Sequence, residues 1–134
     1  MLTNNNEIKK LLTDTKTIAV IGASPKPWRD SWEIATFLQR KGYTVYPVNP
    51  KYGEVLGMKC YPDLKSIPAP VDMIDIFRNP DDVEPVIDEA IAVGATSVWM
   101  QLGVINEPAA AKAERAGLAV VMDRCIAIEH RALM

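Results

Sequence analysis

Five short apolar segments recur along the chain, and each is followed by a turn or by a stretch with helical spacing. The first of them, Thr17 to Ile21, is rich in β-branched residues, which favours an extended strand. The other four have similar length and are bounded by Gly, Pro, Asn or Asp. The pattern predicts five strands: Thr17 to Ile21, Thr44 to Val48, Val71 to Phe77, Ser97 to Leu102 and Leu118 to Met122.

Amphipathic segments with recognisable starts and stops alternate with these strands. A helix capped by Asn6 is expected through Leu12, and a second is expected from Asp30 or Ser31 to Gly42, with Asp30 and Glu33 placed as in a capping box. Three more are expected: one from Asp81 or Asp82 to Gly94, one over Glu107 to Ala116 behind the cap Asn106, and one from Ile126 to Met134. We interpret residues 52–70 as an irregular connection between the second and third strands, with a short edge strand near Met58 to Tyr61 or a helical turn near Leu64.

Strands that alternate with helices of this length predict an α/β fold with a doubly wound, mainly parallel sheet and helices on both faces. No repeat or linker divides the chain, so one domain over residues 1–134 is expected. We expect the five strands, counted along the chain, to lie in the order 3-2-1-4-5, with the first strand central.

Charge and cysteine content exclude several classes of function. The 134 residues carry a formal net charge of −2, which provides no basic field for nucleic acid, and no apolar run is long enough to cross a membrane. Without a signal-peptide core, a cytoplasmic location is expected. Cys60, Cys125 and the single His130 form no metal-ligand spacing, so no metal is assigned, and the two cysteines are expected to be free thiols.

The segment between the first strand and its helix has the composition of an anion-binding loop. Gly22 and Ala23 permit a tight turn and a close ligand, Ser24 adds a hydroxyl, and Lys26 and Arg29 add positive charge near a helix N-terminus. The loop matches neither the Gly-x-Gly-x-x-Gly fingerprint nor a Walker A loop. A surface turn is the alternative, and a mononucleotide or dinucleotide is the preferred interpretation.

The end of the second strand bears on the type of nucleotide. NAD-binding domains carry Asp or Glu there to hold the ribose hydroxyls, whereas this chain has Asn49 followed by Lys51. A cation at that place suits a ribose that carries a phosphate, as in NADP or coenzyme A. Arg78, after the third strand, adds a further charge, although these cations also fit a solvated surface. Phe77 fits either the core or contact with an adenine.

Six sequence blocks give a more specific signal. They are Val20 to Pro27, Pro47 to Pro50, Val55 to Tyr61, Asp75 to Arg78, Val98 to Gly103 and Val121 to Cys125. With these blocks in this order, the chain resembles the small stand-alone CoA-binding proteins that are related to the N-terminal domain of the succinyl-CoA synthetase alpha subunit, and the resemblance covers nearly its whole length. The resemblance implies a Rossmann-like fold and a site for coenzyme A or an acyl-CoA.

The resemblance also implies roles for residues at the strand ends. Gly22, Ala23, Ser24 and Lys26 would hold the CoA phosphates, with Arg29 as an added cation. The nucleotide end would meet Lys51 and its neighbours Val48, Asn49 and Pro50. The adenosine wall would be formed by Phe77, Arg78 and Pro80, and the pantetheine side by Trp99, Met100 and Gln101.

The departure from the synthetase is as informative as the match. The synthetase works through a phosphorylated histidine in a second domain, and this chain has no histidine before His130. We therefore assign no catalytic residue and expect CoA binding without catalysis, unless a protein partner completes a ligase-like site. An NADP-dependent or redox enzyme and a nucleotide-responsive regulatory or interaction module remain as alternatives. Cys125 lies at the ligand edge, where it could exchange with the CoA thiol or serve as a buried structural residue.

Overall fold

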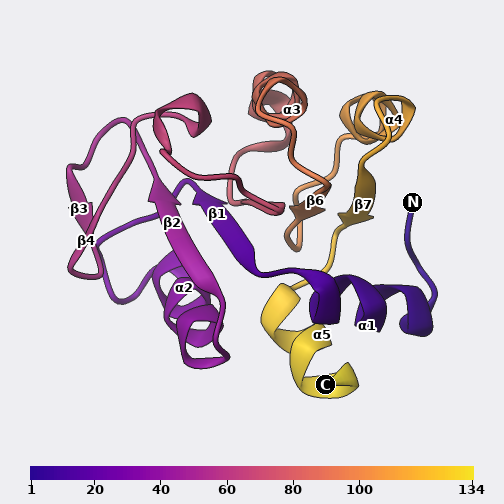
Figure 1. The fold of residues 1–134 in the computed structure, drawn as a ribbon, viewed down its shortest axis with the longest axis horizontal. Helices are drawn as coiled ribbons and strands as arrows, with labels where there is room; N and C mark the ends of the chain where they lie inside the picture. The colour runs from indigo at the N-terminus through magenta and orange to yellow at the C-terminus, as the bar shows by residue number, and fades with distance from the viewer.

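A parallel sheet of five strands forms the middle layer of the structure, a computed structural model that describes residues 1–134. The strands lie in the order β2-β1-β5-β6-β7, and every neighbouring pair is parallel (Figure 1). Their positions confirm the five predicted strands and the α/β class. The bounds are β1 Thr17–Ile21, β2 Thr44–Val48, β5 Met73–Ile76, β6 Ser97–Met100 and β7 Ala119–Met122.

The expected strand order was wrong in one respect. The third predicted strand, β5, pairs with β1 and not with β2, so the order counted along the five strands is 2-1-3-4-5. Pro47 supplies the physical reason, because a proline lacks the N–H that an interior strand would need and is tolerated in an edge strand. With β2 at the edge, β1 remains inside the sheet, between β2 and β5.

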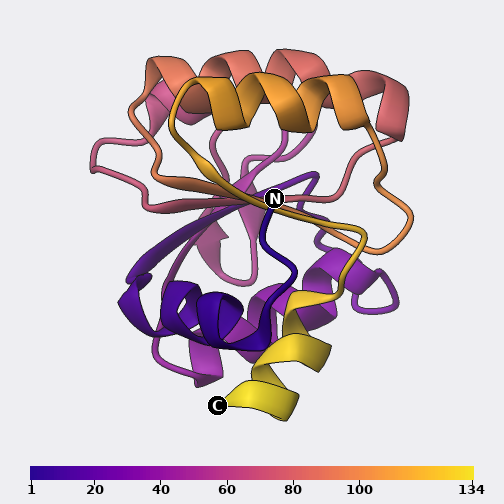
Figure 2. The ribbon, with the colours of Figure 1, turned by 90° about the vertical axis from the view of Figure 1, so that its right-hand side faces the viewer.

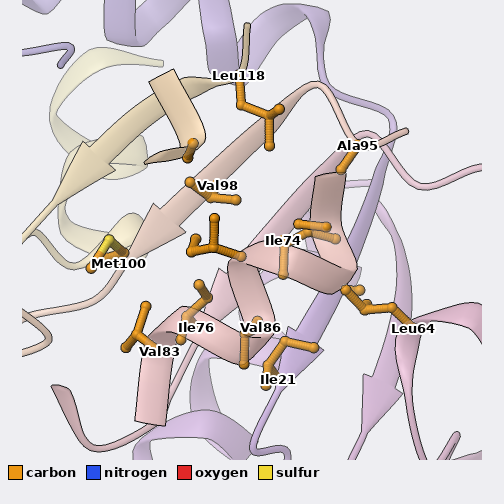
Figure 3. Close-up of a cluster of buried hydrophobic side chains, with 14 of the residues drawn as sticks. Ile21, Leu64, Ile74, Ile76, Val83, Val86, Ala95, Val98, Met100 and Leu118 are labelled. Atoms are coloured by element: carbon orange, nitrogen blue, oxygen red, sulfur yellow. The ribbon is translucent and has the colours of Figure 1, made fainter. Parts of the chain in front are cut away.

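Two helical layers cover the sheet. Helices α1 (Asn5–Asp14), α2 (Asp30–Arg40) and α5 (Ile126–Leu133) lie on one face, and α3 (Val83–Ala92) and α4 (Glu107–Arg115) lie on the other (Figure 2). One hydrophobic cluster of 21 residues packs β-strand side chains such as Ile74 and Ile76 against α3 and α4 (Figure 3). A second cluster of 16 residues, which includes Trp99, lies beneath α1, α2 and α5.

The long connection between β2 and β5 contains both local structures that the sequence left open. Strands β3 (Glu54–Val55) and β4 (Met58–Lys59) form a separate antiparallel pair, and a 3-10 turn, η1, follows at Leu64–Ser66. A second 3-10 turn, η2, covers Pro80–Asp82 and leads directly into α3.

Helix caps follow the sequence in part. Asn106 caps α4 as predicted, because its side chain accepts a hydrogen bond from Ala109 N at 3.0 Å. The cap of α1 is Asn4 and not Asn6, which places the helix start two residues earlier. The capping box expected from Asp30 is absent, since the N-cap of α2 is Arg29 and no side chain accepts from the first turn. The start of α2 is therefore left open to other hydrogen-bond acceptors.

Both edges of the sheet are partly occupied. At the β2 edge, Tyr61 N donates to Pro47 O at 3.0 Å, and at the β7 edge, Leu2 N donates to Val120 O at 2.8 Å. No helix in the structure combines the length and the apolar character needed to cross a bilayer.

One acidic side chain lies inside the core without a partner. Asp75 in β5 is 0% exposed, and neither carboxylate oxygen has a hydrogen-bond partner. The register pairs it with Val20 and Trp99, so it faces the cluster beneath α1, α2 and α5, where the Ser97 hydroxyl is also unpartnered. Burial raises the pKa of Asp75 well above its usual value of 3.8, because the charged form loses its hydration.

This pKa shift predicts a pH-dependent cost in stability. Above about pH 4 the unfolded chain releases the Asp75 proton while the folded chain retains it, so stability falls as pH rises toward the folded pKa. The Asp75→Asn variant cannot titrate. The free energy of unfolding of the variant, measured with urea across a pH series, should therefore rise relative to that of the wild type by up to about 1.4 kcal/mol for each pH unit in that window. The exposed Asp81→Asn change is the control, and parallel curves for Asp75→Asn and the wild type would contradict the expected burial.

Candidate functional site

The turn after β1 brings three strand ends together. Gly22 has a φ of 83°, and its N–H donates to Val48 O of β2 at 2.9 Å. On the other side, Phe77 N donates to Ile21 O at 2.9 Å. A Cβ atom at position 22 would overlap the carbonyl oxygen of Phe77, so only glycine fits this turn. The ends of β2, β1 and β5 are thereby fixed side by side.

Two serines set the shape of the loop that follows. Ser24 N donates to Ser31 Oγ at 3.1 Å, which ties the loop to the first turn of α2, and Lys26 N donates to Ser24 Oγ at 3.1 Å. Both serines are buried, whereas Lys26 and Arg29 are exposed. The loop therefore holds its backbone by internal hydrogen bonds and leaves its cationic side chains in solvent.

Asn49 joins this loop to the one after β2. Its Nδ2 donates to Ala23 O at 3.0 Å, and its Oδ1 accepts from Lys51 N at 2.9 Å. The residue is only 8% exposed, and both the nitrogen and the oxygen of its side-chain amide are hydrogen-bonded to the backbone. Asn49 positions Lys51 beside the β1 loop.

A cavity of about 340 Å³ lies between the two loops. Lys26, Arg29 and Lys51 border it, and none of these cations has a carboxylate within ion-pair distance. The N–H groups of Asp30 and Ser31, at the start of α2, also lack a protein acceptor. Positive side chains and free N–H groups at a helix N-terminus favour an anion, which Asp30, also on the wall, opposes. Gly22, Ser24, Asn49 and Phe77 complete the predicted residues that line this cavity.

A second cavity of about 450 Å³ continues along the same edge of the sheet. Asp30 and Phe77 line both cavities, so the two form one groove. The second part is more apolar, with Ile34, Leu102 and Val104 in its wall. Arg78 and Gln101 are the predicted residues that lie here.

Several predicted site residues lie away from the groove. Trp99 and Met100 are 0% exposed and pack in the two opposite core clusters, and Trp99 Nε1 donates to Arg124 O at 2.8 Å. The structure therefore does not support a ligand contact for either side chain, because both are enclosed by helices. Ala23, Val48, Pro50 and Pro80 line neither cavity.

Other groove residues were missed by the sequence reasoning. Asp30 was interpreted as a helix cap, and Tyr52 lay in a region treated as connection, yet both border the first cavity. Asp82, also interpreted as a helix cap, lines the second, together with Asn79 from the segment Phe77 to Pro80 that the resemblance had assigned to the adenosine wall. Their signal was their place directly after strand ends or at helix starts, since these positions share one edge of a parallel sheet.

The remaining titratable groups lie elsewhere. His130 is 8% exposed and packs edge-on against Phe37 and Tyr43, with ring centroids 5.4 Å and 6.0 Å away. Burial, with a smaller effect from Lys41, lowers the pKa of His130. Both cysteines are free thiols, and burial raises the pKa of Cys60. No group of three His, Cys, Asp or Glu side chains is arranged to hold a metal ion.

Comparison with known proteins matches residues 16–131 to the model of the CoA binding domain. The YneT protein of Bacillus subtilis (strain 168) is 38% identical over 124 residues, which cover 92% of each chain. A solved structure of a hypothetical protein from Pyrococcus horikoshii OT3 is 44% identical, with a TM-score of 0.95 over 98% of this chain and 92% of that one. These matches confirm the resemblance drawn from the six sequence blocks.

A longer relative links this domain to ligases. The chain is 32% identical over 121 residues to acetate–CoA ligase [ADP-forming] I of Archaeoglobus fulgidus, a match that covers 83% of this chain and 18% of the ligase. The region shared with the ligase is therefore less than a fifth of that protein's length.

The close approach at Gly22 predicts a severe effect of Gly22→Ala. The change adds left-handed backbone strain of about 1–2 kcal/mol and, in addition, forces the Phe77 carbonyl to move. Gly57→Ala is the matched control, because Gly57 also has a positive φ of 71° but has nothing within 4 Å of an added Cβ. In urea unfolding, Gly22→Ala should lose clearly more stability than Gly57→Ala. Equal losses would mean that the strand ends are not held by this contact.

Proposed function

The chain belongs to the CoA-binding domain family, and from this premise we propose that it binds coenzyme A or an acyl-CoA in the groove at the carboxyl edge of the sheet. The nucleotide and phosphates would occupy the cavity between the β1 and β2 loops, and the pantetheine arm would extend past Phe77 into the second cavity. The single observation that carries the proposal is this joined pair of cavities, the first with cations and the second more apolar.

The chemistry of the groove matches the two ends of the proposed ligand. Coenzyme A combines a phosphorylated adenosine diphosphate, which is strongly anionic, with an uncharged pantetheine arm that ends in a thiol. Lys26, Arg29 and Lys51 suit the anionic end, because charge-assisted hydrogen bonds to phosphate are the strong ones. Gly22 borders the first cavity, so its backbone lies where the pyrophosphate would be held. Asp30 opposes the anion, but the three cations on the wall of the first cavity outnumber it.

Lys51 distinguishes this ligand from NAD. In an NAD-binding domain the end of the second strand carries an acidic residue for the ribose hydroxyls, and here Asn49 uses its amide to hold the Lys51 backbone instead. We infer that Lys51 meets the 3′-phosphate of the CoA ribose. The competing interpretation is an NADP-dependent enzyme. Measuring the affinities for CoA and NADP separates the two.

We infer further that the chain binds this ligand without catalysis of its own. His130 packs between Phe37 and Tyr43 and does not border the groove. Asp123, at the end of β7, has its Oδ1 engaged by Gly103 N at 2.8 Å. A nucleophile with a positioned base is thus lacking among the groove residues. A protein partner that supplies such groups would act as the remainder of the ligase does in the longer relatives.

Calorimetry should rank the ligands in the order CoA, dephospho-CoA and NAD, from tight to weak. Lys51→Glu should abolish the preference for CoA over dephospho-CoA, because it removes the charge assigned to the 3′-phosphate. Lys26→Glu should weaken both by about 1.5–3 kcal/mol, the scale of a hydrogen bond to a charged group. The control is Lys9→Glu on α1, whose side chain lines no part of the groove. Tighter binding of NAD or NADP would overturn the assignment of the ligand.

The purified protein should not make or break an acyl thioester. Acetyl-CoA and succinyl-CoA, incubated with and without ATP, should release free thiol no faster than in buffer, because the groove offers no paired nucleophile and base. Free thiol is measured with a chromogenic disulfide. If thioester turnover persists after repurification and is lost in Cys125→Ser, the inference that the chain lacks catalysis of its own is disproved.

A further inference from the structure

Cys125 places a thiol in the wall of the second cavity. It follows β7 as the N-cap residue of α5 and is half-buried, with its side chain making no cap hydrogen bond. The other cysteine, Cys60, is 4% exposed, lines neither cavity, and donates its Sγ–H to Asn49 O at 3.6 Å. Only one of the two thiols therefore faces the groove.

A second side chain in the same wall points to a ligand beside this thiol. Gln101 is only 4% exposed, and its Oε1 accepts a hydrogen bond from Ile126 N at 3.3 Å. That bond fixes the amide and leaves its Nε2 without an acceptor in the protein, although the residue lines the cavity. The Nε2 group is not among the fully buried atoms that lack a partner, so its free N–H groups reach the cavity and can donate to a ligand there. The pantetheine arm carries amide carbonyls that would accept from them.

We propose that Cys125 exchanges with the disulfide of coenzyme A bound in the groove, so that one CoA half is retained as a mixed disulfide through its pantetheine sulfur. The inference rests on the proposed CoA binding and names a covalent modification at that site. The co-reactant is the symmetric disulfide of coenzyme A. The Cys125 thiolate attacks one sulfur of this disulfide, a new bond forms between Sγ and that sulfur, and the bond between the two CoA sulfurs breaks. The second CoA leaves as a thiolate and takes up the proton that Cys125 released, so one disulfide replaces another without net oxidation.

Thiol exchange fits this site better than acyl transfer to the same cysteine. Acyl transfer needs a base and a stabilised tetrahedral intermediate, and no histidine lines the cavity. Disulfide exchange needs only a thiolate with access to the target sulfur. Glu129, the one acidic residue of α5, is paired with Arg124 at 3.1 Å and lies outside the cavity wall, so it does not serve as a base for Cys125.

Mass spectrometry of the intact protein tests the proposal. Wild-type protein incubated with CoA disulfide should gain the mass of one CoA less two hydrogens, and peptide mapping should place the adduct on Cys125 and not on Cys60. Binding raises the concentration of CoA disulfide beside Cys125. The reaction rate should therefore saturate with CoA disulfide and should exceed the rate with glutathione disulfide by at least about tenfold. Adenosine 3′,5′-bisphosphate, which carries the nucleotide end without a thiol, should suppress it.

A charge variant separates directed exchange from simple exposure of the thiol. Lys51→Glu should slow modification by CoA disulfide, whereas the control Lys9→Glu on α1 should leave the rates with both disulfides unchanged. Equal rates with the two disulfides, an adduct on Cys60, or no adduct at all would overturn the inference. Calorimetry of the reduced wild type with CoA under a phosphine reductant then locates the failure. Reversible binding without a selective adduct defeats only the covalent step, and no binding defeats the proposed function as well.

Discussion

The carbonyl oxygen of Phe77 occupies the space that any side chain at position 22 would need, and the rest of the groove depends on this contact. It brings the end of β5 against the turn after β1, while the Gly22 N–H holds that turn to Val48 of β2. The two cavities meet at Phe77 for this reason. A side chain at position 22 would push the end of β5 away from this turn and would therefore displace Phe77, which lines both cavities.

The groove is shaped by the protein before any ligand arrives. Ser24, Ser31 and Asn49 direct their polar atoms to backbone groups of the two loops. Their hydrogen bonds fix the loop path, so binding need not supply the entropy cost of ordering it. The exposed lysines and arginine remain free to adapt to the phosphates. The buried polar residues thus position the loops, and the exposed cations supply the positive charge.

The sequence predicted the first cavity better than the second. The loop from Gly22 to Arg29 could be recognised because small residues, cations and a helix start coincide there. The contacts of Trp99 and Met100 could not, since their positions inside β6 bury both side chains, and only Gln101, just beyond the strand, reaches the edge. The strand order was missed because Pro47, inside the second predicted strand, was given no weight in placing that strand. Its missing N–H was in fact evidence that β2 lies at an edge.

The occupied edges of the sheet have a consequence for how this chain associates with others. Open strand edges invite a second chain to extend the sheet, which leads to domain exchange or aggregation. Here Pro47 offers no donor, its carbonyl is engaged by Tyr61, and the Val120 carbonyl on the far strand is engaged by Leu2. Growth by strand addition is therefore blocked at these positions on both sides. A second strand could pair at these positions only by displacing Tyr61 or Leu2 from the edge that each occupies.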